Sequence, residues 1–195
     1  MNINIPNIYK VFNGKKFFSS ENLLLRSISK NEIELIRIWR NRQTKILRQT
    51  QIISKEKQEE YFRKYVWNEM NSLNPKQILL SIIKNDITIG YGGFVNISWQ
   101  DRRAEISFIL SDEIAKNETL YEKIFSEFIF LVQEIAFKNL NLNRIYTETY
   151  DIRPLHISIL EKNKFKFEGR MKCHLIIDNK KVDSLLHGCL KDDAK

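Results

Sequence analysis

The chain has 195 residues, a length typical of one domain with a core of its own. Hydrophobic residues make up 43% of the sequence and charged residues 29%, with only 3 Pro and 6 Gly, which excludes a disordered or collagen-like chain. The 32 Lys and Arg residues outnumber the 24 Asp and Glu residues, giving a net charge of +8. This balance either favours an anionic substrate or partner or only keeps the protein soluble. Because the basic residues are spread along the chain instead of forming one run, no nucleic-acid partner is expected.

Location and metal content can be predicted from what the sequence lacks. No apolar run approaches the ~18 residues of a membrane span, so no membrane partner is expected. Residues 1–10 lack the basic and then apolar pattern of a secretory signal. We therefore expect a cytoplasmic protein. The two cysteines have no CxxC spacing and the three histidines lie far apart, which predicts neither a disulfide framework nor a metal site.

The first part of the chain predicts an arm, a strand and two helices. Residues 1–22 have no clear period and predict an irregular N-terminal arm or added strand, before a single domain over 23–195. The apolar run over 23–28 predicts a strand. Ser29 and Glu32 have capping-box spacing and predict a helix that ends near Asn41. A second helix is expected after Ser54, with an amphipathic face formed by Gln58, Tyr61, Phe62, Tyr65, Val66 and Glu69.

The rest of the chain alternates between strand-like and helix-like patterns. Runs of β-branched and aromatic residues predict an antiparallel meander over 77–84, 87–97 and 103–110. Next come a long helix opened by Thr119 with Glu122 in capping register, and a short helix that begins near Pro154. Further strands are expected over 143–149, 165–177 and 182–190. A strand, long helix and strand in succession imply one parallel pair in an otherwise antiparallel sheet, so the predicted class is α+β.

Four stretches of this pattern resemble the GNAT family of acyl-CoA N-acyltransferases, especially its branch of ribosomal-protein and nucleotide-sugar acetyltransferases. They are Leu25-Arg26 followed by Ile38-Trp39-Arg40-Asn41, 89–94 followed by 103–108, 145–148, and 159–169. The resemblance covers residues 23–190. It implies a mixed, mostly antiparallel sheet with one parallel strand pair and flanking helices. It also implies acetyl-CoA as co-substrate, with no metal.

Two segments depart from the family pattern. The family binds the CoA pyrophosphate with a glycine-rich loop at the start of the long helix, where backbone amides and the positive helix end meet phosphate. Residues 114–120 contain no glycine here, and Glu118 and Glu122 place negative charge in the first turn. In the helix after the fifth strand, Arg153 stands where the family has Asn. Leu160 stands where the family often has a Tyr, a proposed acid for the leaving thiolate.

The resemblance implies catalytic residues on two neighbouring strands. Glu105 on the fourth strand is our first choice for the base that takes the ammonium proton, with surface pairing to Arg102 or Arg103 as the alternative. Glu148 on the facing strand is the competing base. Tyr150 is the candidate acid for the thiolate, with Ser158 nearby in sequence. His156 and His174 are expected to be structural.

Binding residues follow from the same resemblance. Backbone amides of the fourth strand and side chains around the long helix are expected to hold CoA: Ser107, Phe108, Ile109, Leu110, Lys116, Asn117, Thr119 and Arg153. The expected acceptor wall consists of Arg40, Asn41, Tyr91, Gly92 and Gly93, with the two glycines forming a bulge. Trp39 is expected in the core.

The predicted function is transfer of an acetyl group from acetyl-CoA to a primary amine of a small molecule. A nucleotide-linked amino sugar is the preferred acceptor. One alternative is acetylation of a protein N-terminus, as in the ribosomal-protein relatives. Another is a GNAT-fold binding protein that has lost acyl-CoA use, because the loop at 114–120 lacks glycine. The final hairpin could pair with a second copy, which would form a homodimer.

Overall fold

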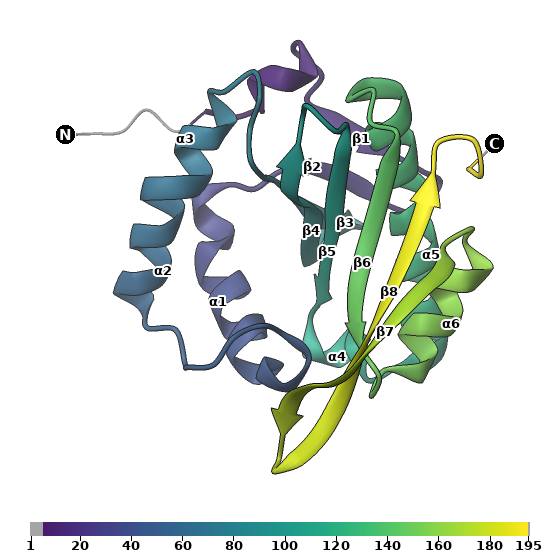
Figure 1. The fold of residues 1–195 in the computed structure, drawn as a ribbon. Helices are drawn as coiled ribbons and strands as arrows, with labels where there is room; N and C mark the ends of the chain where they lie inside the picture. Colours follow the sequence, from purple (N-terminus) through teal and green to yellow (C-terminus); the bar gives the residue numbers. More distant parts are fainter. Residues whose placement is uncertain (1–5, 195) are drawn as a thin grey trace.

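The computed structural model describes residues 6–194. An eight-stranded sheet runs through its centre in the order β1-β2-β3-β4-β5-β6-β8-β7 (Figure 1). Its strands are β1 (Phe17–Ser19), β2 (Leu24–Ser27), β3 (Ile78–Lys84), β4 (Ile87–Ser98), β5 (Arg103–Leu110), β6 (Arg144–Tyr150), β7 (Lys166–Ile177) and β8 (Lys180–Leu190). Every neighbouring pair is antiparallel except β5 and β6, which confirms the predicted α+β class and its one parallel pair.

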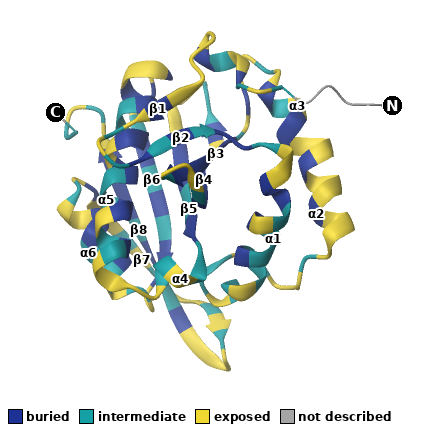
Figure 2. Cartoon of the chain, turned by 180° about the vertical axis from the view of Figure 1, so that it is seen from behind, coloured by how far each residue is buried: buried dark blue, intermediate teal, exposed yellow. Residues whose placement is uncertain are grey.

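Helices cover both faces of this sheet (Figure 1). One face carries α1 (Ile33–Arg42), α2 (Lys55–Tyr61) and α3 (Trp67–Met70); the other carries α5 (Glu118–Glu134) and α6 (Pro154–Lys162). The short α4 (Asp112–Ala115) connects β5 to α5. Further helical turns are η1 (Lys10–Phe12), η2 (Lys30–Glu32), η3 (Thr44–Ile46), η4 (Phe62–Val66) and η5 (Ile135–Asn139). Buried residues lie along the strands and the inward helix faces (Figure 2).

The described part of the N-terminal arm, residues 6–22, packs against the rest of the domain. Tyr9, Phe12 and Phe18 are buried, and the Tyr9 hydroxyl accepts a hydrogen bond from the Leu79 amide at 2.8 Å. β1 pairs with β2 at the edge of the sheet, as expected of an added strand. Residues 1–5 of the predicted arm lie outside the described residues.

One predicted helix start, at Ser29, is confirmed, and another, at Thr119, is wrong. The capping box of Ser29 and Glu32 is present, and the Glu32 carboxylate accepts from the Ser29 amide at 2.7 Å. The predicted cap at Thr119 is wrong. The Asn117 side chain accepts from the Leu120 amide at 3.0 Å, so α5 begins earlier and Thr119 lies inside its first turn.

The helix after Ser54 is interrupted by a wide π turn, η4. Phe62 and Val66 are buried as predicted, whereas Tyr65 is exposed. A π turn adds a residue to the turn and rotates the positions that follow it. As a result, Trp67 and Met70, which the simple helical period omits, are buried as well.

The predicted bulge at Gly92 and Gly93 is wrong. The register of β4 runs unbroken through both residues toward β3 and β5, and its irregularities lie elsewhere, between Val95 and Ser98 for example. A Cβ at Gly92 would collide with the Ser107 carbonyl oxygen and lie 2.7 Å from the Phe128 ring. The glycine therefore allows strands and α5 to approach closely.

The parallel pairing of β5 and β6 is short. It covers Arg103–Glu105 of β5 and ends at the pair of Glu105 and Tyr146, while the outer neighbours of both strands stay paired for longer. The two strands therefore separate after Glu105. We call this gap the opening.

The β7–β8 hairpin projects beyond the sheet (Figure 1). An ion pair between Lys45 and Asp178 joins its tip to η3. A bulge between Met171 and Leu175 interrupts its pairing. This irregular segment brings the His174 imidazole within 3.5 Å of the Glu148 carboxylate.

Candidate active site

Three cavities meet around the opening. The helix-side cavity, about 370 Å³, lies between α1, α2 and the sheet. The split cavity, about 220 Å³, passes between β5 and β6, and the α6 cavity, about 250 Å³, lies beside α5 and α6. Arg40, Val95 and Ser107 line both the helix-side and split cavities, and Arg153 and His156 line both the split and α6 cavities. The cavities therefore connect the two faces of the sheet through the opening.

Glu105 stands where the opening begins and is only 7% exposed. Its Oε1 accepts from Arg48 Nη2 at 2.8 Å, and its Oε2 accepts from Arg48 Nη1 at 3.2 Å and from Asn96 Nδ2 at 2.8 Å. Arg48, and neither Arg102 nor Arg103, is thus its cationic partner. The carboxylate is fixed at the mouth of the split cavity.

Arg48 also binds the second predicted base. Its Nη2 donates to Glu148 Oε2 at 2.6 Å, so one guanidinium bridges carboxylates from β5 and β6. The structure thus brings Glu105 and Glu148 together. Arg48 itself was missed because it follows η3 in an irregular segment, where no periodicity marks its direction. Its positive charge is the only feature of the sequence that could have suggested a role for Arg48.

Tyr150 lines the split cavity as well. Burial raises the pKa of its phenol, with Arg48 acting in the opposite direction. Its hydroxyl has no hydrogen-bond partner among residues 6–194. Ser158, its neighbour in the sequence hypothesis, does not line any of the three cavities.

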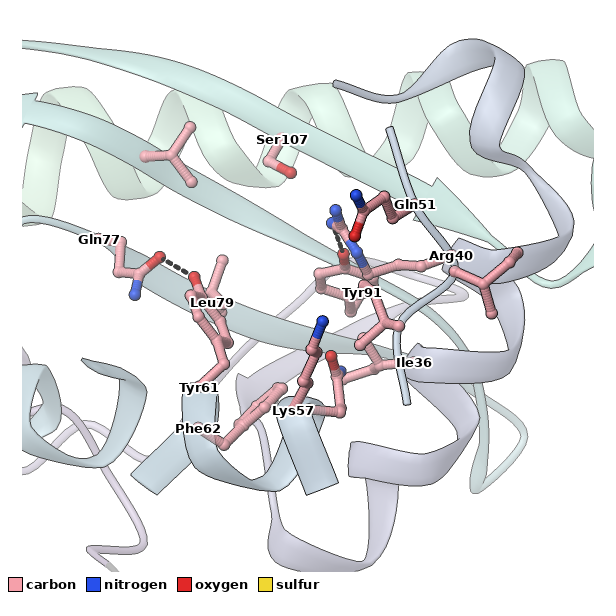
Figure 3. A pocket seen from close by; sticks show the side chains of 14 residues that line it. Ile36, Arg40, Gln51, Lys57, Tyr61, Phe62, Gln77, Leu79, Tyr91 and Ser107 are labelled. Carbon is pink, nitrogen blue, oxygen red and sulfur yellow. Dashed lines mark hydrogen bonds between the residues drawn. The ribbon is translucent and has the colours of Figure 1, made fainter. Parts of the chain in front are cut away.

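The helix-side cavity has a cationic end (Figure 3). Arg40 donates to the Tyr91 hydroxyl at 2.8 Å and to Gln49 at 3.1 Å, and the Lys57 ammonium points into the same space (Figure 3). Within the described chain, neither cation forms an ion pair with a carboxylate, and no Asp or Glu lines this cavity. Lys57 was not among the predicted residues, because a lysine in an exposed first helical turn carries no distinctive pattern.

Three of the residues predicted for the acceptor wall do not line the helix-side cavity. Asn41 donates to the Ile53 carbonyl and accepts from the Ile53 amide, each at 2.9 Å, so it fixes the segment before α2. Gly92 and Gly93 lie inside the sheet, against β5 and β3, and do not line the cavity. Of the predicted wall, only Arg40 and Tyr91 line the helix-side cavity.

Strand alternation decides which backbone groups of β5 face the opening. The Ser111 amide bonds to the Ile89 carbonyl of β4. Because successive residues of a strand direct their amides to opposite sides, Ser107 and Ile109 also face β4. Phe108 and Leu110 then face the opening, and the Leu110 carbonyl already accepts from Gln43 Nε2 at 2.8 Å.

At the start of α5, a turn of helix takes the place of a glycine loop. The amides of Ala115, Lys116 and Asn117 bond to the carbonyls of Ser111, Asp112 and Ile114 at 2.9, 3.2 and 3.0 Å. These amides are therefore not free for a ligand. The side chains of Lys116 and Arg42 line a shallow hollow beside them, whereas Asn117 caps the helix and Thr119 is exposed.

Arg153 belongs to a buried cluster under the opening. Its Nη2 donates to the Tyr121 hydroxyl at 2.8 Å and lies 3.3 Å from His156 Nδ1; the Tyr121 hydroxyl is 2.7 Å from the same nitrogen. The His156 ring stacks on Phe125 with centroids 4.1 Å apart. Burial, together with Arg153, holds the pKa of His156 well below its usual value, so the ring is neutral. Burial raises the pKa of Tyr121.

The family model for the acetyltransferase (GNAT) domain matches residues 25–186. The chain belongs to the GNAT family. It is an acetyl-CoA-dependent N-acetyltransferase, as the sequence resemblance implied. No curated protein sequence matches it.

Solved GNAT structures share the fold at low identity. The spermidine N-acetyltransferase of Vibrio cholerae in complex with CoA and spermine has a TM-score of 0.77 and 17% identity, covering 90% of this chain and 99% of that one. A chimera of the V. cholerae enzyme with hSSAT has a TM-score of 0.75 and 18% identity, covering 89% and 98%. Such identities show the fold alone. The ribosomal-protein and nucleotide-sugar branch therefore stays a prediction.

This GNAT enzyme has groups that suit acetyl-CoA. The open edge of β5 offers the Phe108 and Leu110 amides to the amide-bearing arm of the co-substrate, and Lys116 and Arg42, which pairs with Asp112 at 3.1 Å, suit its phosphates. Arg153, which was predicted to contact a CoA phosphate, is held instead by the Tyr121 hydroxyl. Side chains would thus replace the glycine loop. No described helix has the length and apolar character needed to cross a membrane.

Proposed function

We propose that this enzyme acetylates the primary amine of a small molecule whose remaining part carries an anionic group, such as a nucleotide-linked amino sugar. The observation that carries this proposal is the pair of cations, Arg40 and Lys57, in a cavity without a carboxylate among its lining residues. Arg40 is partly buried, and a partly buried cation is usually paired, while the exposed Lys57 adds a second positive charge at the same cavity. A phosphate or carboxylate of the acceptor supplies the missing partner.

Glu105 is the proposed base. An ammonium entering from the helix-side cavity reaches Ser107 and Val95, which also border the split cavity, and meets the Glu105 carboxylate there. It takes the place of the Arg48 guanidinium, which now occupies that carboxylate. Glu105 then accepts the ammonium proton directly or through water, and the free amine attacks the thioester. The Phe108 amide at the open edge of β5 polarises the thioester carbonyl.

The test is a comparison of acceptors with purified protein and acetyl-CoA, following thiol release and product mass. The acceptors are a nucleotide-linked amino sugar, the same amino sugar without its nucleotide, spermidine, and a peptide with a free N-terminus. We expect the nucleotide-linked sugar to have the highest kcat/KM. Removing its phosphates should lower kcat/KM about tenfold or more, the usual value of a charge-assisted hydrogen bond.

Other outcomes would identify the alternatives. Preferred turnover of the peptide would favour N-terminal acetylation of proteins. Binding of neither CoA nor any acceptor would favour the non-catalytic hypothesis raised by the glycine-free loop.

A polyamine is the second candidate acceptor. The V. cholerae enzyme was crystallised with spermine, and the carboxylates of Glu105 and Glu148 could bind an ammonium group. However, Arg40 and Lys57 would repel the further ammonium groups of a polyamine along the helix-side cavity. Faster turnover of spermidine than of the nucleotide-linked sugar would reverse the order of the two candidates.

A further inference from the structure

The enzyme lacks a proton donor where its family often has a tyrosine. Leu160 occupies that position on α6 and is fully buried in the core. Acyl transfer nevertheless releases a thiolate that needs a proton. Among the polar side chains of α6 and its N-cap residue, Arg153 and His156 border both the split and α6 cavities.

Hydrogen-bond geometry fixes the proton positions in this cluster. His156 Nδ1 faces the Tyr121 hydroxyl at 2.7 Å and Arg153 Nη2 at 3.3 Å. A guanidinium can only donate, so Nδ1 must be an acceptor. Tyr121 therefore donates its phenolic proton to Nδ1 and accepts from Arg153 at 2.8 Å. Since the ring is neutral, its single proton is on Nε2.

The proton on His156 Nε2 is available for donation to a bound molecule. Within the described chain, Nε2 has no hydrogen-bond partner, although the ring borders both cavities. The Phe125 ring stacks on the face of the imidazole with centroids 4.1 Å apart, and the Phe108 ring lies at a centroid distance of 6.4 Å. Apart from Arg153 and Tyr121, the titratable group that acts on it is His187 of β8.

We propose that His156 protonates the departing CoA thiolate, with Tyr121 as the group that replaces its proton. The proton on Nε2 moves to the sulfur as the carbon–sulfur bond breaks and the sulfur retains the bonding electron pair. The Tyr121 phenolic proton moves to Nδ1. The phenolate that remains is stabilised by Arg153 and regains a proton from solvent after CoA leaves. The relay rests on acetyl-CoA chemistry and is independent of the acceptor.

This assignment differs from the sequence-based candidate. Tyr150 lies on β6 next to Arg48 and Glu148, in the carboxylate part of the split cavity. The Tyr121 cluster is instead buried against α5 and α6. Variants at the two tyrosines therefore separate the two hypotheses.

The first measurement is calorimetric binding of CoA and desulfo-CoA at about pH 9, above the usual thiol pKa of about 8.5. We expect wild-type protein to bind CoA about tenfold more tightly than desulfo-CoA, because a thiolate accepts a charge-assisted hydrogen bond from Nε2. His156→Phe keeps a flat ring against Phe125 and should abolish this preference, with the affinity for desulfo-CoA unchanged. An equal preference in His156→Phe, or no preference in wild type, would overturn the proposal.

The second measurement follows acetyl transfer to hydroxylamine, which is uncharged at neutral pH and requires neither a base nor the acceptor cavity. Tyr121→Phe should lower this rate about tenfold or more, within the range of general acid catalysis, while desulfo-CoA binding stays the same. Tyr65→Phe, on the exposed side of η4, is the control and should match wild type. A larger loss in Tyr150→Phe than in Tyr121→Phe would assign the acid to Tyr150 instead. Neither measurement uses the proposed acceptor, so both can be interpreted even if the nucleotide-linked amino sugar is not the preferred substrate.

Discussion

Arg48 and Glu105 form two hydrogen bonds, at 2.8 and 3.2 Å, although they lie 57 residues apart in sequence. The same guanidinium reaches Glu148. A cation of the protein therefore occupies the carboxylates that an acceptor ammonium would need. Arg48 is 52% exposed at its side chain and comes from an irregular segment, so it can be displaced without disturbing the core.

Glu105→Gln should lower kcat/KM by about 10²- to 10⁴-fold, the usual contribution of a general base. The amide retains the size of the side chain but cannot accept the ammonium proton. Steady-state kinetics with the best acceptor of the panel measures the loss. Glu148→Gln, on the facing strand, is the matched variant, and we expect a loss of about tenfold at most. A larger loss in Glu148→Gln would exchange the roles of the two carboxylates.

Arg48→Gln should lower the KM for the amine, because the ammonium no longer competes with a guanidinium. The unfolding free energy should fall by about 1–3 kcal/mol, because the side chains of Glu105 and Glu148, only 10% and 14% exposed, lose their shared cationic partner. Kinetics and urea denaturation of the same preparation test both statements. A higher KM, or a lower kcat with KM unchanged, would show that Arg48 assists the reaction instead of blocking it.

Gly92→Ala should destabilise the protein by about 3 kcal/mol, in the range of overpacked cores. The added methyl group would collide with the Ser107 carbonyl and the Phe128 ring. Gly169→Ala is the control, since nothing lies within 4 Å of the corresponding Cβ. Urea denaturation compares the two variants. Equal stabilities would contradict the close approach of β4, β5 and α5.

Stability should fall in mild acid because of His156. Its pKa is depressed by burial, so below about pH 6.5 the unfolded chain takes up a proton that the folded chain does not. The contribution of neutral His156 to the unfolding free energy is complete above that pH. Below it, this contribution is lost at up to ~1.4 kcal/mol per pH unit. Urea denaturation between about pH 7 and 5 should show this slope in wild type and a smaller one in His156→Phe. Parallel slopes would contradict a neutral, buried His156.

Local patterns predicted the fold well. The capping box at Ser29, the helix start at Pro154 and the single parallel pair all depend on short-range signals, and the structure has them. Two predicted site residues, Glu105 and Glu148, do lie close together and share one guanidinium, whereas their catalytic roles stay a prediction. Their bridge, Arg48, depends on tertiary folding of an irregular segment, which leaves no period in the sequence.

Tyr121 was not among the predicted residues, because only its position beside His156 in the folded protein gives its hydroxyl a role. The prediction for two glycines was wrong for a similar reason. Gly92 and Gly93 suggested a bulge because glycine weakens a strand. Their actual reason, contact with neighbouring strands and with Phe128, becomes visible only once the sheet is assembled.

The most direct test of the proposed acceptor class compares Lys57→Met with wild type. Lys57 is exposed and forms no ion pair in the described chain, so its replacement should leave folding intact. The ratio of kcat/KM for the nucleotide-linked amino sugar to that for the same sugar without its nucleotide should be about ten or more in wild type and fall severalfold in Lys57→Met. An unchanged ratio, together with spermidine as the faster substrate of wild type, would contradict an anionic acceptor.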